Sequence, residues 1–282
     1  MNPILTGYLL MVAAACLIPL GDAVAKFAHE TYDVPITFMA WSRFALGAVL
    51  IAPFALRRSV TLSELVVGSV LLRGVLISAT VWFILQAVSR EDIATAYGAF
   101  FIAPLVSFVM AVIFLRERPG ALRVTLVCLG FLGVLLVVQP SFSISVGILL
   151  ALFSGLCYGS FLTISRFLAG HHRPMAMLWA QLIVGGIVMA PFGTDLGETR
   201  IAAGLWICVM ISAATSAGAN LMMVEAYRRV QATRLAPLIY TQLIAATLYG
   251  ILFFSTLPGL WALLGLGLLI ISGFAALLIS ED

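Results

Sequence analysis

The chain has 282 residues, of which 63% are apolar and only 10% are Asp, Glu, Lys or Arg. A soluble domain carries about 25% charged residues, so this composition excludes a water-soluble globule and indicates a polytopic integral membrane protein. The net charge of +3 comes from basic residues that are scattered between apolar runs, which excludes the clustered basic surface of a nucleic-acid-binding protein.

Ten apolar runs are long enough to cross a bilayer, which takes about 20 mostly apolar residues per helix. Backbone groups cannot stay unpaired in lipid, so each run is predicted to be a helix. We expect the first run to stay in the protein, because Met1 to Met11 lacks the Lys or Arg of a signal peptide. In chain order the runs cover residues 4–27, 35–56, 65–88, 93–115, 121–138, 147–169, 175–193, 203–226, 232–254 and 260–279.

Basic residues in the short loops predict the orientation, because loops rich in Lys and Arg stay in the cytoplasm. The loops opposite the N-terminus contain Lys26, Arg90 and Arg200, while the loops on its own side contain most of the others. Both termini are therefore predicted in the cytoplasm. The basic residues on the N-terminal side are Arg57, Arg58, Arg116, Arg118, Arg123, Arg166, Arg173, Arg228, Arg229 and Arg234.

The two halves of the chain match each other in an ordered series, at an offset near 140 residues. Trp41 aligns with Trp179, and Pro119-Gly120 aligns with Pro258-Gly259. Single matches between apolar segments are weak, but an ordered series at nearly constant offset indicates an internal repeat.

Each half contains five of the predicted helices, in residues 1–138 and 147–282, with a linker at 139–146. An odd number of helices turns the second half upside-down in the membrane. We therefore predict an all-α polytopic membrane protein with ten transmembrane helices in two inverted five-helix repeats. This architecture is typical of secondary transporters, which bind their substrate near the midplane between the halves.

Three segments resemble a known family. The second and seventh helices end in Ala52-Pro53-Phe54 and Ala190-Pro191-Phe192, and Arg116–Gly120 follows the fourth helix. With the five-plus-five pattern, these segments resemble the EamA-type transporters of the drug/metabolite transporter superfamily over essentially the whole chain. Pro104 and Pro237 also fit the family pattern. The resemblance implies export of a solute across a bacterial inner membrane.

Two positions depart from the family pattern. Phe254–Leu257 stands where the family often repeats the glutamate, and Gln242 replaces a usual proline. Within the family the chain is most similar to YddG-type amino-acid exporters, which implies alternating-access export of aromatic or other amphipathic amino acids. Transport of another metabolite or of a drug-like cation, and channel-like facilitation, are alternative interpretations. The sequence has no P-loop, so ATP is not the direct drive.

Ionisable side chains inside the spans are the first candidates for transport, because such groups are costly in a membrane and usually face the bundle interior. Asp22 and Lys26 lie four residues apart on one helix face. They can pair and act as a gate or proton-coupling site at the external mouth, or neutralise each other at the interface. Arg43 can hold a substrate carboxylate, snorkel outward or pair with Asp22. Arg73 can face the interior or snorkel, and Glu225 can take up a proton or form a salt bridge with the arginines after it.

Aromatic and amide side chains within the spans form the second group. A cavity lined by hydroxyl, indole and amide groups suits an amphipathic, partly aromatic solute. The alternative is helix–helix hydrogen bonding, which contributes about 0.6 kcal/mol per contact. The candidate cavity residues are Trp41, Arg43, Trp82, Tyr97, Phe101, Tyr158, Trp179, Gln181, Asn220, Tyr240 and Gln242.

The fifth and tenth helices contain glycines but no ionisable residue, Tyr, Trp or Asn over residues 124–138 and 262–279. Small residues permit close helix packing, so we assign these two helices to the scaffold or to a homodimer contact, with the transport pathway lined by the other eight. The cysteines lie in apolar runs without CxxC spacing, and the spans lack clustered catalytic groups. We expect no metal, no cofactor and no enzymatic activity.

Overall fold

The computed structural model describes residues 3–57, 67–114, 116, 120–138, 145–168, 172–196, 199–230 and 235–278. The regular elements in these ranges are helices, and no β-strand is among them. Within them, seven helical segments are long and apolar enough to cross a membrane. The other three predicted runs form shorter apolar helices, at Val124–Val138, Leu238–Phe254 and Leu260–Ala275. In chain order the helices are α1 (Pro3–Tyr32), α2 (Ile36–Arg57), α4 (Gly68–Val88), α5 (Ile93–Phe100), α6 (Ala103–Phe114), α7 (Ala121–Val138), α8 (Val146–Leu168), α9 (Pro174–Gly193), α10 (Ala203–Tyr227), the 3-10 helix η1 (Ala236–Tyr240), α12 (Thr241–Phe254) and α13 (Leu260–Leu278).

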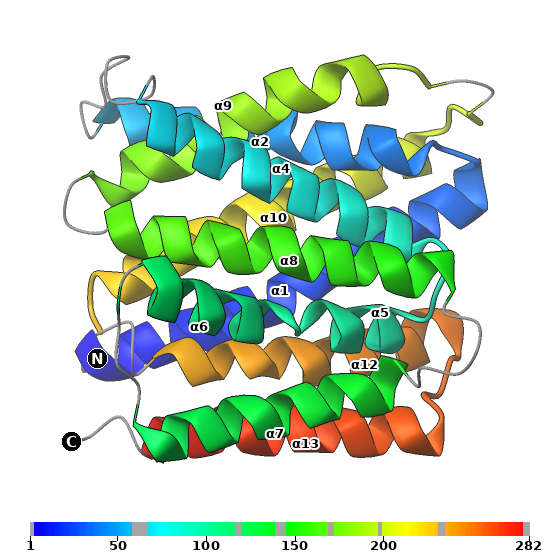
Figure 1. Cartoon of the computed structure of the whole chain (residues 1–282). Coiled ribbons are helices and arrows are strands. Elements are labelled where there is room, and N and C mark those ends of the chain that lie inside the picture. Colours follow the sequence, from blue (N-terminus) through cyan, green and yellow to red (C-terminus); the bar gives the residue numbers. More distant parts are fainter. Residues whose placement is uncertain are drawn as a thin grey trace.

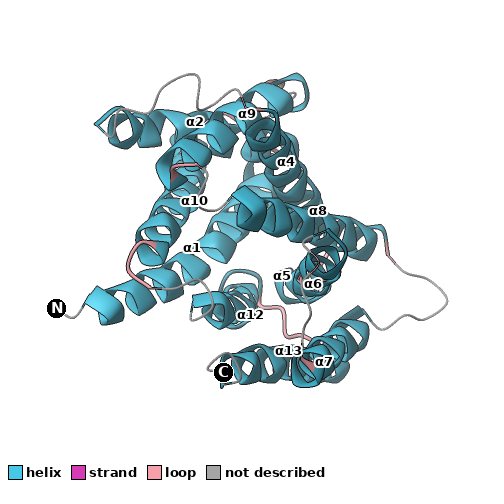
Figure 2. Ribbon diagram, turned by 60° about the vertical axis from the view of Figure 1, so that its left-hand side comes forward, coloured by secondary structure: helices cyan, strands magenta, loops and turns pink. Residues whose placement is uncertain are grey.

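Four helix pairs make the most extensive contacts of the bundle: α1 with α10, α4 with α8, α2 with α9, and α7 with α13. The helices run side by side, and α1 begins at the same end of the bundle as α13 ends (Figure 1). Figure 2 shows the α2–α9 and α7–α13 pairs at opposite edges, with the α1–α10 and α4–α8 pairs on either side between them.

Large apolar side chains stay exposed along the helices. Val49, Ile113 and Leu252 are 69%, 62% and 73% exposed. In water such surfaces promote association, whereas the hydrocarbon of a bilayer is a suitable solvent for them. The exposed apolar faces and the helix lengths together fit a multi-pass membrane protein.

The α7–α13 pair depends on glycine. A Cβ atom added at Gly133 would lie 2.9 Å from the carbonyl oxygen of Gly265, and one added at Gly265 would lie 2.5 Å from that of Gly133. The two backbones therefore approach too closely for any larger residue. The glycines predicted for scaffold or dimer contacts thus lie in a contact between two helices of the same chain. The homodimer stays a prediction.

Two spans are interrupted. The fourth span consists of α5 and α6, separated by a turn at Phe101 and Ile102. Pro104 in the first turn of α6 has no N–H to donate to the carbonyl of Phe100, so a regular helix cannot continue through this point. The ninth span begins with η1, which contains Pro237, and becomes α-helical only at Thr241.

Candidate functional site

A buried charge cluster joins four helices in the half of the bundle where α1 ends. Arg43 of α2 donates Nη1–H to Oδ1 of Asp22 of α1, and the two residues are only 4% and 1% exposed. Tyr97 of α5 donates its hydroxyl to Oδ2 of Asp22 at 2.6 Å. Nε and Nη2 of Arg43 donate to Oγ of Ser212 of α10 at 3.2 and 3.1 Å. The pair with Asp22, one of the three roles considered for Arg43, is present in the structure.

Lys26 does not pair with Asp22, so the pairing expected from their spacing is wrong. Its Nζ donates to the carbonyl oxygen of Glu91 at 2.8 Å, lies 3.9 Å from the carboxylate of Glu30, and lies 5.0 Å from the ring centroid of Phe254. The flexible lysine stem extends toward the chain before α5, while the Asp22 carboxylate turns toward α2 and α5. Lys26 thus cross-links the end of the bundle at which α1 ends.

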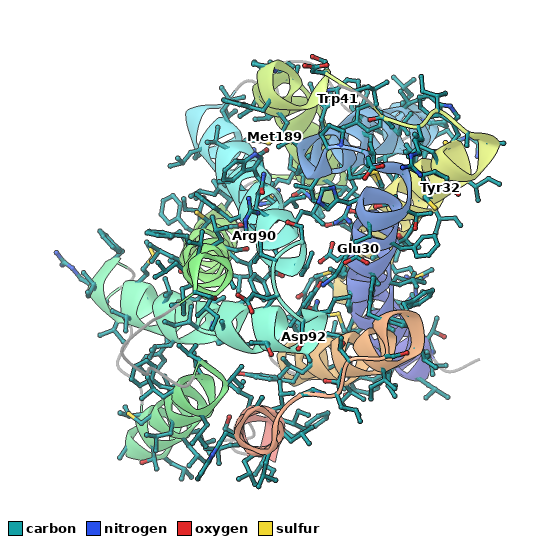
Figure 3. All side chains as sticks on the ribbon, turned by 90° about the vertical axis from the view of Figure 1, so that its right-hand side faces the viewer. Glu30, Tyr32, Trp41, Arg90, Asp92 and Met189 are labelled. Atoms are coloured by element: carbon teal, nitrogen blue, oxygen red, sulfur yellow. The ribbon has the colours of Figure 1, made fainter. Side chains whose placement is uncertain are left out.

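Figure 3 looks onto this end and labels Glu30 and Tyr32 of α1 together with Arg90 and Asp92 from the segment before α5. Farther along the chain, Nε of Arg200 lies 3.3 Å from Oδ2 of Asp33. This pair is exposed and contributes little stability by itself. With the buried cluster and Lys26, it closes this end with polar contacts.

Four of the predicted cavity residues make helix–helix contacts instead. Nε1 of Trp41 donates to the carbonyl of Gly186, and Nε1 of Trp179 donates to that of Ala48, both at 3.1 Å across the α2–α9 contact. Nε2 of Gln181 donates to Oδ1 of Asn220 at 3.3 Å between α9 and α10. Oε1 of Gln181 is buried without a hydrogen-bond partner.

Three other predicted residues meet in one cavity of about 220 Å³ between α6, α7, α8, α13 and η1. The ring of Phe101 lies 5.2 Å from that of Tyr240, and the ring of Phe100 lies 5.2 Å from that of Tyr158, as measured between centroids. Hydroxyl groups of Ser107 and Ser272 also line the wall, and no lining residue is charged. The aromatic residues of the wall are Phe100, Phe101, Phe108, Phe131, Tyr158 and Tyr240.

The cavity lies where the two interrupted spans meet, since Phe101 belongs to the turn between α5 and α6 and Tyr240 ends η1. Helix α8 approaches this turn through two glycines. A Cβ atom at Gly155 would lie 2.5 Å from the carbonyl oxygen of Phe100, and one at Gly159 would lie 2.6 Å from that of Ala103. Tyr158, between these glycines, is thereby held against the cavity.

The remaining candidates lie outside the cavity. Trp82 of α4 packs against Phe83, with ring centroids 5.0 Å apart, and Gln242 is buried at the start of α12. Glu225 forms ion pairs with Arg228 and Arg229, at 3.0 and 2.9 Å. The salt bridge considered for Glu225 is therefore present.

The cavity also contains residues that the sequence did not single out. Phe100, Phe108 and Phe131 line it, and in an apolar run such a phenylalanine looks the same as one that faces lipid. Helices α7 and α13, which were assigned away from the pathway, supply part of the wall. Among the described residues, no group of three or more His, Cys, Asp or Glu side chains could hold a metal ion.

Comparison with known proteins agrees with this architecture. A riboflavin transporter of Vibrio cholerae is 24% identical over 95% of this chain and 91% of its own length. A pseudopaline exporter of Pseudomonas aeruginosa is 26% identical over 96% of this chain and 95% of its own. One solved crystal structure superposes with a TM-score of 0.70 at 17% identity, covering 98% of this chain and 99% of that one. At that identity the likeness shows the fold alone.

A family model accounts for nearly all of the chain. It matches twice, once over residues 5–139 and again over residues 145–278. These matches agree with the apolar helical bundle and with relatives that are named as transporters. The chain is a multi-pass membrane transporter that belongs to the EamA-like transporter family.

Proposed function

We propose that this chain is a secondary transporter that exports small metabolites across the inner membrane by alternating access between two inverted five-helix repeats. The proposed solutes are amino acids with an aromatic or other amphipathic side chain. Both termini lie in the cytoplasm in this proposal, because the loops on the side of the N-terminus contain most of the arginines.

The packing supports two repeats related by a two-fold axis. Let α8, α9, α10, α12 and α13 be the counterparts of α1, α2, α4, α5–α6 and α7. Exchanging the halves then turns the α1–α10 contact into the α8–α4 contact and leaves α2–α9 and α7–α13 as they are. The hydrogen bonds of Trp41 and Trp179 exchange in the same way. With five helices in each half, such an axis lies in the membrane plane.

The proposed substrate site is inferred from one observation, which is that the two interrupted spans meet at the cavity. The interruptions lie at Phe101–Ile102 and at Tyr240, which correspond in the two halves at the offset that relates Trp41 to Trp179. Inverted-repeat transporters bind their substrates at such discontinuous helices. Aromatic rings and hydroxyl groups around a cavity of about 220 Å³ suit the side chain of an aromatic amino acid.

The closed end of the bundle supports a gate there. Through Ser212 and Phe254, the Asp22–Arg43 cluster and Lys26 link helices of both halves at the end where α1 finishes. Helix α6, which lines the cavity, lies toward the end where α1 begins (Figure 1). A cavity on the cytoplasmic side suits an exporter that loads its solute from the cytoplasm. We assign Asp22 and Lys26 to this gate and keep Asp22 and Glu225 as the candidates for proton coupling.

The names of the relatives support a small organic solute without fixing its identity, because one is named for riboflavin and another for pseudopaline. Another metabolite, a drug-like cation and channel-like facilitation are therefore the competing proposals. Counterflow separates them. Proteoliposomes are loaded with excess unlabelled phenylalanine, tryptophan, riboflavin or a quaternary ammonium dye, and uptake of the same compound in labelled form is measured. The two amino acids are expected to accumulate, with saturation and trans-stimulation.

A matched pair of variants ties this activity to the cavity. Tyr240→Leu removes a ring from the wall and is expected to raise the half-saturation concentration about 2- to 10-fold, since an aromatic contact contributes about 0.5–1.5 kcal/mol. Tyr249→Leu changes a tyrosine in the same span outside the cavity and is expected to leave transport unchanged. Unsaturable flux without trans-stimulation would rule out the carrier and favour a channel.

A further inference from the structure

Arg73 points into the bundle, so it does not take the snorkelling position considered for it. Nε donates to Oγ of Ser165 of α8 at 2.7 Å, and Nη1 donates to the carbonyl oxygen of Met177 of α9 at 3.0 Å. The guanidinium carbon lies 4.4 Å from the ring centroid of Phe161 of α8. Contacts to two neighbouring helices hold the half-buried cation on the side of the bundle away from the closed end.

These partners are all neutral. A hydroxyl, a carbonyl and a ring contact the Arg73 guanidinium, and no described residue places a carboxylate within ion-pair distance of it. Arg43, the arginine of the buried cluster, is in contrast neutralised by Asp22. A guanidinium has five N–H donors, and the hydrogen bonds of Arg73 to described residues use two of them. An ionisable group inside a membrane protein marks a candidate functional site, and a cation whose described partners are all neutral suits an anionic ligand.

The position of Arg73 relates this charge to the cavity. The ring of Tyr158, which lines the cavity, stacks on Phe161 with centroids 5.6 Å apart and an interplanar angle of 15°. Phe161 in turn contacts Arg73. A solute that places its ring against Tyr158 is thus connected to the Arg73 cation through Phe161, in the proposed cytoplasmic half of the bundle.

We propose that Arg73 binds the carboxylate of the transported solute, so that the protein selects aromatic solutes that carry a free acid group. The planar fork of the guanidinium suits a carboxylate. The same charge repels cations, so this inference opposes the proposal of a drug-like cation as solute. It rests on the proposed transport function and names the solute class.

Binding tests this inference apart from transport. The purified protein in detergent is titrated with 3-phenylpropionate and 3-phenylpropionamide, and with phenylalanine and phenylalaninamide, following tryptophan fluorescence and the melting temperature. The wild-type protein is expected to bind each acid at least about 10-fold more tightly than its amide, as a charge-assisted hydrogen bond predicts. Arg73→Gln is expected to remove this preference, Arg73→Lys to keep part of it, and Arg57→Gln, which changes an exposed arginine at the same end, to leave it intact.

The outcomes separate the two proposals. Equal binding of acid and amide by the wild-type protein would overturn the role of Arg73, whether or not Arg73→Gln folds, and so would an acid preference that survives in Arg73→Gln. Stabilisation by phosphatidylglycerol that depends on Arg73, without discrimination between acid and amide, would assign the arginine to a lipid headgroup and overturn it as well. Arg73-dependent acid binding without any counterflow would support the site and refute the transport function.

Discussion

At the scale of single residues, Arg43 and Arg73 differ in the charge of their partners. Arg43 has a carboxylate partner, and its Nε and Nη2 donate to Ser212. Arg73 has only neutral partners among the residues that the structure describes. A buried pair is sensitive to the loss of one member, because the other is left as an uncompensated charge. The first arginine is therefore expected to matter for stability and the second for binding.

Single substitutions in the buried cluster test the stability role. Asp22→Asn or Arg43→Gln is expected to lower the free energy of unfolding by about 3–5 kcal/mol, as for other broken buried pairs. The double variant removes both charges and is expected to lose less than the two single losses combined. Unfolding in mixed detergent micelles, followed by tryptophan fluorescence, measures these changes. Additive losses would contradict a direct pair, and Arg90→Gln, at an exposed site, serves as the control.

The burial of charged residues was easier to predict from the sequence than the identity of their partners. Asp22, Lys26 and Arg43 stood out because ionisable residues are rare in apolar runs. Spacing along one helix suggested that Asp22 pairs with Lys26, yet its partners come from α2 and α5. Contacts between helices depend on packing that one-dimensional spacing does not contain. For the same reason the sequence left Arg73 undecided between the lipid interface and the interior.

At the scale of helices, the interruption of the fourth span and the glycines of α8 form one feature. Pro104 stops the regular helix, and Gly155 and Gly159 let α8 lie against the carbonyl groups at the turn. Because those neighbours are backbone atoms, they cannot move aside as the end of a flexible side chain can. This close contact also positions Tyr158 in the cavity wall.

Adding a single methyl group at this contact tests its tightness. Gly155→Ala places a Cβ atom 2.5 Å from the carbonyl oxygen of Phe100, so the melting temperature is expected to fall, corresponding to about 1–3 kcal/mol of overpacking. Gly218→Ala in α10 meets no atom within 4 Å and is expected to be neutral or to stabilise by up to about 1 kcal/mol. If the two variants melt alike, α8 does not pack tightly against the turn.

Helix positions follow largely from hydrophobicity, because only long apolar segments suit a bilayer. All ten predicted runs contain apolar helices, although α1 extends to Tyr32, beyond the predicted end near residue 27. The roles of the helices were harder to predict. The glycines of α7 and α13 correctly indicated close packing, but Ser272 and Phe131 also place these helices at the cavity. A cavity forms between helices, so no single run identifies its walls.

At the scale of the whole molecule, the pattern of contacts matches the internal repeat. Reciprocal bonds of Trp41 and Trp179 cross the α2–α9 contact at equal distances. Gly47 and Gly185 are reciprocal as well, since a Cβ atom at each would meet Leu182 and Phe44 respectively. The charge cluster has no counterpart of its own kind in the repeat, because Leu162 and Gln181 stand at the positions that correspond to Asp22 and Arg43. The two halves therefore share their helix packing but not the charge cluster.

The proposed inverted topology makes a prediction that two equivalent glycines can test. Gly120 and Gly259 follow aligned prolines before α7 and α13, both are exposed, and a Cβ atom at either meets nothing within 4 Å. Each is changed to cysteine in a background in which Cys16, Cys128, Cys157 and Cys208 are replaced by alanine. In intact cells, a membrane-impermeant maleimide is expected to label Gly259→Cys, whereas Gly120→Cys reacts only after the membrane is permeabilised. Labelling of both cysteines from the same side would mean that the two halves share one orientation. In that case no axis in the membrane plane could exchange the two ends of the bundle, and alternating access between inverted repeats would be excluded.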